Sequence, residues 1–266
     1  MDTNFIVIFS YFIVIYRIIQ LYEVLIAMSF QNQFTKTTTD ANLMETVHHG
    51  SAEYPFRYYY ENIALFDFKC IDWHWHSELE FIYIKSGNVV FDIGTVHFEL
   101  NEGNGIMINS KILHRLQSSS DAIIPNFLFQ PSFIAPQDSL IYKKYINPVI
   151  SSSLEYLVFQ PDIPWQKKAL EIIKTIIAVQ ETEFNREIIV SMSVQQLWIL
   201  LLENLTFDQF ENMGAVISRT RLQLMMQYVH AHYSENITLE DIARTANISK
   251  STALHLFQNN LKLTPV

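Results

Sequence analysis

Two histidines separated by one residue, His74 and His76, are followed four residues later by a glutamate, Glu80. Imidazole nitrogens and carboxylates suit divalent transition metals, and the same groups also hydrogen-bond small polar ligands. Because successive side chains of a strand point to opposite faces, a strand that continues through this run places all three on one face. His114 follows a later apolar run and reaches them only through the tertiary fold. The four residues therefore predict either a metal site or a ligand pocket.

The segment from residue 54 to about residue 133 has the pattern of short β-strands that would position these side chains. Runs rich in aromatic and β-branched residues, such as FDFKCIDWHWH, LEFIYIKSGN and VVFDIGTVHFEL, alternate with turn signals. Residues 86–88 and 101–105 are rich in glycine and asparagine, which tolerate positive φ. Close spacing without long helical stretches favours an antiparallel barrel or sandwich.

The run His74, His76, Glu80 and Gly87 fits the pattern H-x-H-x3-E-x6-G and resembles the first motif of the cupins. His114 stands where the second cupin motif has its histidine, although NSKIL replaces the usual P-x-G before it. The resemblance implies a small β-barrel in which these three histidines and the glutamate hold a divalent metal. The alternative is a metal-free barrel whose same four side chains bind a small-molecule effector or hydrogen-bond one another.

The following segment, residues 161–215, is predicted to be helical. PWQKKALEIIKTIIAVQ begins with a proline, and Leu170, Ile173 and Ile176 recur at the spacing of one helix face. The sequence is apolar all round from Leu197 to Leu202, so a helix there should be buried on several sides. We expect this run to pack on the barrel, to form the seam of a homodimer, or to do both.

The C-terminal part reads as an amphipathic helix followed by two short helices about a tight turn. The amphipathic helix has one apolar face, made of Leu222, Met225, Met226, Val229 and Tyr233. Thr238 with Asp241 three residues later is a capping-box signature. Asn247 tolerates the left-handed conformation that the turn requires, and Ser249 can cap the second short helix. This is the layout of a helix-turn-helix.

The second short helix, over residues 250–260, has two contrasting faces. Ala253, Leu256 and Phe257 form its buried stripe. The opposite stripe follows the i, i+3, i+4, i+7 spacing and is polar enough to face a major groove, with cationic groups near phosphate. The predicted DNA-binding residues are Arg244, Ser249, Lys250, Ser251, Leu254, His255 and Gln258.

The stretch ITLEDIARTANISKSTALHLFQNNLKLTP, including its S-x-x-x-L-x-x-L-F-like run and closing threonine-proline, resembles the first helix-turn-helix of AraC/XylS-type transcription regulators. Those proteins commonly join a cupin-like sensing barrel to a helical linker and to this reader. The resemblance therefore covers roughly residues 55–266 in the expected order. It implies a ligand-responsive, sequence-specific DNA-binding regulator and no enzyme.

Two departures from the family pattern stand out. Family members carry two helix-turn-helix units, whereas this chain ends at Val266 after the first, so we expect a truncated regulator with weakened DNA binding. His255 stands where the reading helix usually has arginine, and a neutral imidazole lacks the bidentate guanine contact of arginine. Two alternatives stay open: a metal-dependent cupin enzyme, and a decoy that dimerises with a full-length regulator.

The formal net charge of −9 argues against a protein that coats nucleic acid with its whole surface. The single cysteine, Cys70, excludes an internal disulfide framework and fits the reducing cytoplasm. Residues 5–27 are mostly apolar and suggest a membrane anchor, a buried helix, or sequence upstream of a true start at Met28; we favour the last.

The expected fold class is α+β, with four parts. Residues 1–27 form the apolar leader, and residues 28–160 a cupin-like antiparallel β-barrel that senses a ligand. Residues 161–215 form a helical linker and dimerisation region. Residues 216–266 form a partial all-α domain that holds the first helix-turn-helix unit.

Overall fold

The computed structural model describes residues 36–40, 43–94, 96–182, 184–205, 213–261 and 264–265. The predicted leader, residues 1–27, lies outside this range. The strands are β1 (Phe56–Asn62), β2 (Cys70–His74), β3 (Leu79–Tyr83), β4 (Asn88–Ile93), β5 (Val96–Asn101), β6 (Gly105–Ile108), β7 (His114–Gln117), β8 (Ile123–Phe129) and β9 (Tyr156–Phe159).

The α-helices follow the strands, except for one short helix inserted before β9. They are α2 (Asn147–Ile150), α3 (Pro164–Val179), α4 (Arg186–Asn204), α5 (Met213–His232), α6 (Leu239–Thr245) and α7 (Lys250–Leu261). Short 3-10 turns η1 (Ile63–Leu65), η2 (Asp67–Lys69) and η3 (Pro131–Phe133) and a π-helical turn η4 (Tyr142–Ile146) connect the strands and helices.

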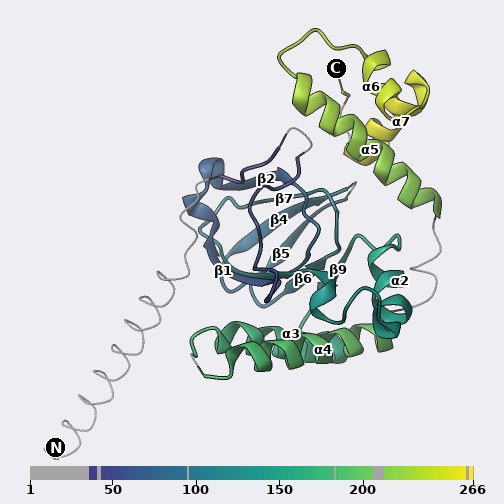
Figure 1. The fold of residues 1–266 in the computed structure, drawn as a ribbon. Helices are drawn as coiled ribbons and strands as arrows, with labels where there is room; N and C mark the ends of the chain where they lie inside the picture. Colours follow the sequence, from purple (N-terminus) through teal and green to yellow (C-terminus); the bar gives the residue numbers. More distant parts are fainter. Residues whose placement is uncertain are drawn as a thin grey trace, which may run out of the picture.

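The strands form two antiparallel sheets that curve around a shared interior (Figure 1). One sheet has the order β1-β8-β3-β6-β9, and the other has the order β2-β7-β4-β5. All the pairings between neighbouring strands are antiparallel. The α+β class and the antiparallel, cupin-like barrel predicted from the sequence are confirmed.

Strand β3, in the middle of the five-stranded sheet, shows how alternation builds two separate cores. Leu79 and Phe81 belong to the core between this sheet and the helices, where the Phe81 ring stacks on Phe127 at 5.3 Å between centroids. Ile82 belongs to the core between the two sheets. Glu80 has the same parity as Ile82 and lines a cavity inside the barrel. The alternation of side chains along β3 therefore places the Glu80 carboxylate in the interior of the barrel.

Helices α3 and α4 lie side by side under the five-stranded sheet (Figure 1). From the predicted apolar run, Leu197, Trp198 and Leu201 are buried in the core that joins sheet and helices. Ile199 is 57% exposed, so the run is buried on one side and not all round. The reason is that α4 has a layer of protein on one face only, so its outward side chains meet solvent.

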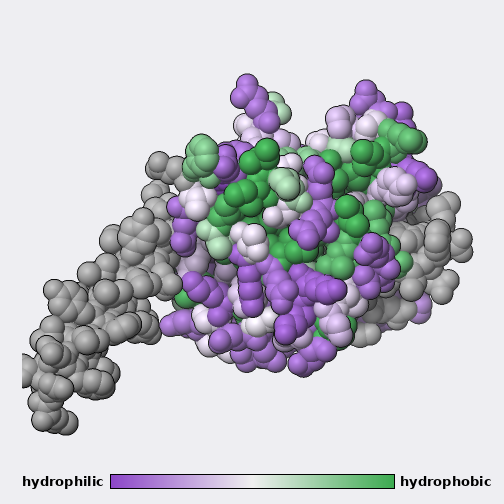
Figure 2. Space-filling model, turned by 90° about the horizontal axis from the view of Figure 1, so that it is seen from below, coloured by the Kyte–Doolittle hydropathy of each residue, from purple (hydrophilic) through white to green (hydrophobic). Residues whose placement is uncertain are grey.

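The outward face of α4 keeps large apolar side chains. Ile188, Met192 and Ile199 are 61%, 67% and 57% exposed, and their i, i+4, i+11 spacing puts them on one stripe. Figure 2, which views the molecule from the side of α3 and α4, shows hydrophobic patches between hydrophilic ones on this face. Exposed apolar stripes of this kind are typical of interaction surfaces.

Helices α5, α6 and α7 form a small unit with its own core (Figure 1). Leu222 and Met225 of α5 are buried against Ala243, Ala253 and Phe257. The predicted apolar face of α5 is therefore observed, with one correction. Tyr233 is 79% exposed, because α5 ends at His232 and the chain turns away from the core there.

Local sequence explains the helix-turn-helix. The Thr238 side chain accepts a hydrogen bond from the Asp241 amide, and the Asp241 carboxylate accepts one from the Thr238 amide, which completes the capping box. Asn247 adopts φ 53° in the turn, and Ser249 accepts a hydrogen bond from the Thr252 amide at the start of α7. No helix in the described part of the chain is long and apolar enough to cross a membrane.

Candidate functional site

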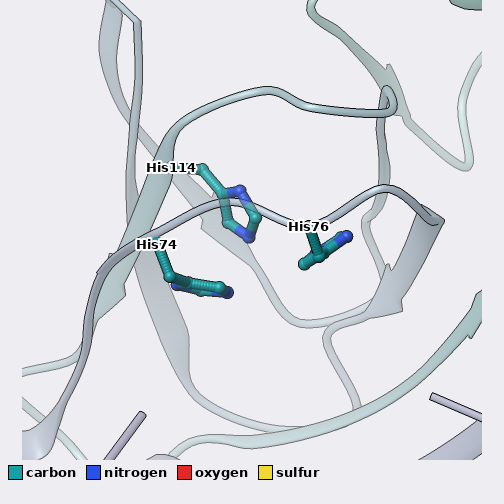
Figure 3. Close-up of side chains that lie close together, drawn as sticks. All are labelled: His74, His76 and His114. Carbon is teal, nitrogen blue, oxygen red and sulfur yellow. The ribbon is translucent and has the colours of Figure 1, made fainter. Parts of the chain in front are cut away.

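The barrel brings together the four side chains that the sequence singled out. His74 ends β2 and His114 begins β7, and the two are register partners on neighbouring antiparallel strands. His76 follows β2 in a loop, and Figure 3 shows its ring close to those of His74 and His114. One nitrogen from each of the three lies within 4.8 Å of the others, and all three residues are buried.

Glu80 joins the histidines by a different route from the one predicted. The sequence pattern suggested one strand through His74, His76 and Glu80, but β2 ends at His74 and Glu80 lies on β3 of the facing sheet. Its Oε2 lies 3.4 Å from His76 Nε2 and 3.2 Å from His114 Nε2. The strand is interrupted because the chain must cross from one sheet to the other between residues 75 and 78.

The backbone fixes which nitrogen of each histidine faces the site. Nδ1 lies 2.8 Å from the Asp72 carbonyl for His74, and 2.9 Å from the Ile112 carbonyl for His114. His76 Nδ1 lies 3.3 Å from the carbonyl of Glu78. A carbonyl oxygen only accepts, so Nδ1 must carry the proton and the neutral ring turns the Nε2 lone pair inward. Metal-ligating histidines show this arrangement.

An electrostatic conflict marks the centre of the site. The buried Nε2 of His114 has no hydrogen-bond partner among the residues that the structure describes, although the Glu80 carboxylate lies 3.2 Å away. Two lone pairs facing each other in a buried place are costly unless a proton or a cation lies between them. Three inward nitrogens and one carboxylate therefore fit a divalent transition metal, and they are the groups that would hold it.

The pKa values reflect the same geometry. Burial, together with the neighbouring His114, lowers the pKa of His74 to about 3, so its ring is neutral at pH 7. Burial by itself would raise the pKa of Glu80, but a proton on the facing nitrogen of His114 or His76 holds it well below its ordinary value, as a bound cation would in its place. A neutral imidazole beside an ionised carboxylate is the protonation state that a metal requires of its ligands.

Two site residues that sequence reasoning missed come from the segment before β1. His49 is buried, with Nδ1 2.9 Å from the Tyr59 hydroxyl and Nε2 3.0 Å from Glu45 Oε2. Burial alone would lower the pKa of His49, but the Glu45 carboxylate raises it. The His49 ring packs edge-on against His76 at 5.7 Å between centroids. The E-x-x-x-H spacing of Glu45 and His49 is present in the sequence, but no sequence pattern predicts that this segment packs against the barrel.

His74 and Glu80, together with Glu45 and His49, line a chamber inside the barrel with a cavity volume of about 40 Å³. Its polar lining includes Asn126, whose amide donates to Glu61 Oε2 at 2.7 Å. Its remaining walls come from both sheets and from the segment before β1: Lys36, Thr37, Thr38, Glu45, Val47, His49, Tyr59, Phe66, Ile71, His74, Glu80, Leu116, Ile124 and Leu128.

The predicted DNA-binding residues lie at the surface of the helix-turn-helix. Leu254 is half-buried, and the other six are exposed: Arg244, Ser249, Lys250, Ser251, His255 and Gln258. Lys250 Nζ lies 3.2 Å from Glu240, and Arg244 lies 3.4 Å from Asp241 and 3.8 Å from Glu240. Ser249 also serves as the cap of α7, so its hydroxyl already has a structural role.

Comparison with known proteins agrees with this architecture. Residues 66–136 match the family model described as the AraC-like ligand binding domain. The HTH-type transcriptional regulator YdeC of Bacillus subtilis (strain 168) is 32% identical over 234 residues, which cover 85% of this chain and 78% of the relative. The lactose operon transcription activator of Staphylococcus xylosus is 23% identical over 143 residues, 52% of this chain and 50% of that protein.

Among solved structures, apo ToxT K231A from Vibrio cholerae strain SCE256 covers 82% of this chain and 97% of its own, with 10% identity and a TM-score of 0.36. This similarity is weak, whereas the similarity to YdeC extends over most of both chains. The similarity to YdeC, together with the match of residues 66–136 to the ligand-binding domain, shows that the chain belongs to the AraC-type HTH transcriptional regulators.

Proposed function

We propose that this regulator binds DNA sequence-specifically through α7 and that the chamber inside the barrel is its effector site. The helix-turn-helix carries the proposal. Ala253 and Phe257 anchor α7 in the core of its unit, while Ser251, His255 and Gln258 remain exposed on the other side. Serine and glutamine hydrogen-bond base edges, so this stripe has the chemistry of direct readout in a major groove.

The division of labour follows the order of the elements. The barrel within residues 28–160 senses the effector, residues 161–215 link and dimerise, and residues 216–266 read DNA in the cytoplasm. His74, His76, Glu80 and His114 are the effector-binding residues. Arg244 and Lys250 approach phosphate once DNA competes with their carboxylate partners. The family membership favours a regulator over an enzyme.

The outward stripe of α4 is the dimer seam in this proposal. Ile188, Met192 and Ile199 would lose their exposure in a symmetric pair of helices, and a two-fold dimer presents two readers to two half-sites. This extends the sequence prediction, with one change. The side chains that form the seam lie on the opposite face of the helix from Leu197 and Leu201, which the core already buries.

A selection from random-sequence DNA tests the proposal. The full chain should enrich a short motif, and Gln258→Ala should weaken binding to it by about 1–3 kcal/mol and relax the preference at one base position. Gln137→Ala, in an exposed loop of the barrel region, is the matched control and should change nothing. Absence of any enriched motif from the wild-type chain would reject the proposal.

A further inference from the structure

The chamber beside His74 and Glu80 is covered by the segment that precedes β1, here called the strap (residues 36–40 and 43–49). Its backbone pairs with the loop between the two ligand histidines: the Glu45 amide donates to the Trp75 carbonyl at 2.9 Å, and the Trp75 amide donates to Leu43 at 3.0 Å. Leu43 and His49 of the strap are buried. The strap is therefore tied to the same loop that carries His74 and His76.

The enclosed volume limits what the chamber can hold. Pockets for organic ligands are about 300–1,000 Å³, whereas a water molecule needs only about 10–15 Å³. The chamber has about 40 Å³, which is room for an ion with a few water molecules. A sugar or an aromatic acid does not fit beneath the strap as it lies.

The charged side chains that line the chamber also favour a small cation. The carboxylates of Glu45, Glu61 and Glu80 line the chamber, and Lys36 is the one cationic side chain among the described residues of the lining. The inward-facing Nε2 atoms of the histidines offer lone pairs to a cation. A small anionic effector would be repelled by these carboxylates, while a divalent cation would be held by them.

Resting on the proposed function, in which the chamber is the effector site, we propose that the effector of this regulator is a divalent transition-metal ion. The ion is bound by the Nε2 atoms of His74, His76 and His114 and by the carboxylate of Glu80, with the strap as its cover. Three imidazoles and one carboxylate select zinc, nickel, iron or copper and disfavour magnesium and calcium, which take oxygen ligands.

His49 has a positioning role in this assignment. Both of its ring nitrogens are occupied, one by Tyr59 and the other by Glu45, so it has no lone pair to give to the ion. Its ring edge instead packs on His76 and fixes the orientation of that ligand. Residues behind the ligands of a metal typically change its affinity by about 10–100-fold.

Titration calorimetry of the full chain, stripped by a chelator, tests the site. Zinc should bind with one ion per chain and magnesium should not. Glu80→Gln and His114→Gln should each weaken zinc binding at least tenfold, with circular dichroism confirming that the barrel is folded. His97→Gln is the matched control, because His97 also pairs with a carboxylate, Asp92, at 2.6 Å but is exposed. Loss of zinc binding in the control, or none in the wild type, overturns the assignment.

His49→Phe separates the positioning role from a ligand role. The variant keeps a ring against His76 but loses the bonds to Tyr59 and Glu45. It should still bind one zinc ion, with an affinity about 10–100-fold lower. A stoichiometry that falls to zero would make His49 a ligand, and an unchanged affinity would remove it from the site.

The effector role needs DNA as the readout. Random-sequence DNA is selected with the stripped chain and again with the zinc-loaded chain, and the affinity for enriched sequences is compared. At least a fivefold change with zinc, absent in Glu80→Gln, supports the inference. If DNA is enriched but its affinity is the same with and without zinc, the effector role of the metal is rejected and the proposed DNA-binding function still stands. No enriched DNA in either arm, with zinc still bound, instead rejects the proposed DNA-binding function, and with it the effector role.

Discussion

The rings of His74 and His114 lie 4.1 Å apart between centroids, on residues that are direct partners of neighbouring antiparallel strands. Their Nδ1 atoms both face backbone carbonyls, so both Nε2 atoms face the interior. Two imidazolium ions at this separation would repel strongly in a buried place, which agrees with the lowered pKa of His74. The pair therefore presents two inward-facing nitrogens that can bind one cation.

A first prediction concerns heat stability. Because the ligands are brought together only in the folded barrel, zinc should stabilise it by about 2.7 kcal/mol at a hundredfold excess over its dissociation constant. Differential scanning calorimetry should show the barrel transition move up with zinc and return after chelation. The same zinc addition to His114→Gln should leave the transition in place; an equal shift in that variant would mean that zinc binds elsewhere.

A second prediction concerns the core between sheet and helices. Phe81 is 1% exposed and stacks on Phe127 and Phe129, so Phe81→Ala should cost about 3–5 kcal/mol through lost burial and a cavity. Phe68 is 100% exposed, and Phe68→Ala should change stability by less than about 0.5 kcal/mol. Urea unfolding followed by circular dichroism measures both. Similar losses for the two variants would contradict the assignment of the core.

The sequence predicts those features of the molecule that depend on interactions between residues close together in the chain. The capping box of Thr238 and the left-handed Asn247 follow from side-chain chemistry within a few residues, and both are observed. The β-character of the barrel follows from alternation. The position of Glu80 does not follow, because parity holds only along one strand and the chain changes sheets after His74.

The strap was beyond sequence reasoning for a related physical reason. Glu45 and His49 carry no strand or helix pattern, and their contacts with His76 and Tyr59 depend on backbone pairing with residue 75. The exposed face of α4 could not be predicted for a different reason. An apolar run shows that burial is needed, but it cannot tell which face meets the core, so Ile199 was grouped with Leu197.

A third prediction concerns the helix-turn-helix. Thr238→Ala removes the side-chain acceptor for the Asp241 amide and should destabilise the start of α6 by about 1 kcal/mol. Hydrogen exchange at the α6 amides should become faster, while the barrel amides stay unchanged. Thr175→Ala is the control: its hydroxyl donates to Glu171 within helix α3, where alanine is a good replacement. Unchanged exchange in α6 would show that the cap contributes nothing.

A fourth prediction concerns self-association. Met192→Glu puts a charge in the middle of the apolar stripe of α4 and should dissociate the proposed homodimer by at least tenfold, because an unpaired charge would be buried in the seam. Sedimentation velocity at micromolar concentration measures this. Val96→Glu, at a 37% exposed position on β5, should leave the dimer intact. A wild-type chain that sediments as a monomer would remove the seam.

The last prediction concerns Glu240, which holds both cations beside the reading helix. Its carboxylate lies 3.2 Å from Lys250 and 3.8 Å from Arg244. Exposed ion pairs contribute little to stability, so Glu240→Gln should fold normally. It should bind DNA about fivefold more tightly at low salt, because removing one negative charge near phosphate is worth about 1 kcal/mol and frees Lys250, while Arg244 keeps Asp241 as its partner. The slope of binding against salt should steepen by about one.

Glu235→Gln provides the matched control for that change. Glu235 is exposed in the same unit and pairs with His232 at 3.1 Å instead of with Lys250 or Arg244. Its replacement by glutamine alters the net charge by the same amount. Filter binding over a series of salt concentrations compares the two. If both variants strengthen DNA binding equally, net charge alone explains the effect and Glu240 does not hold the cations back from DNA. A gain confined to Glu240→Gln would place phosphate next to Lys250 and Arg244.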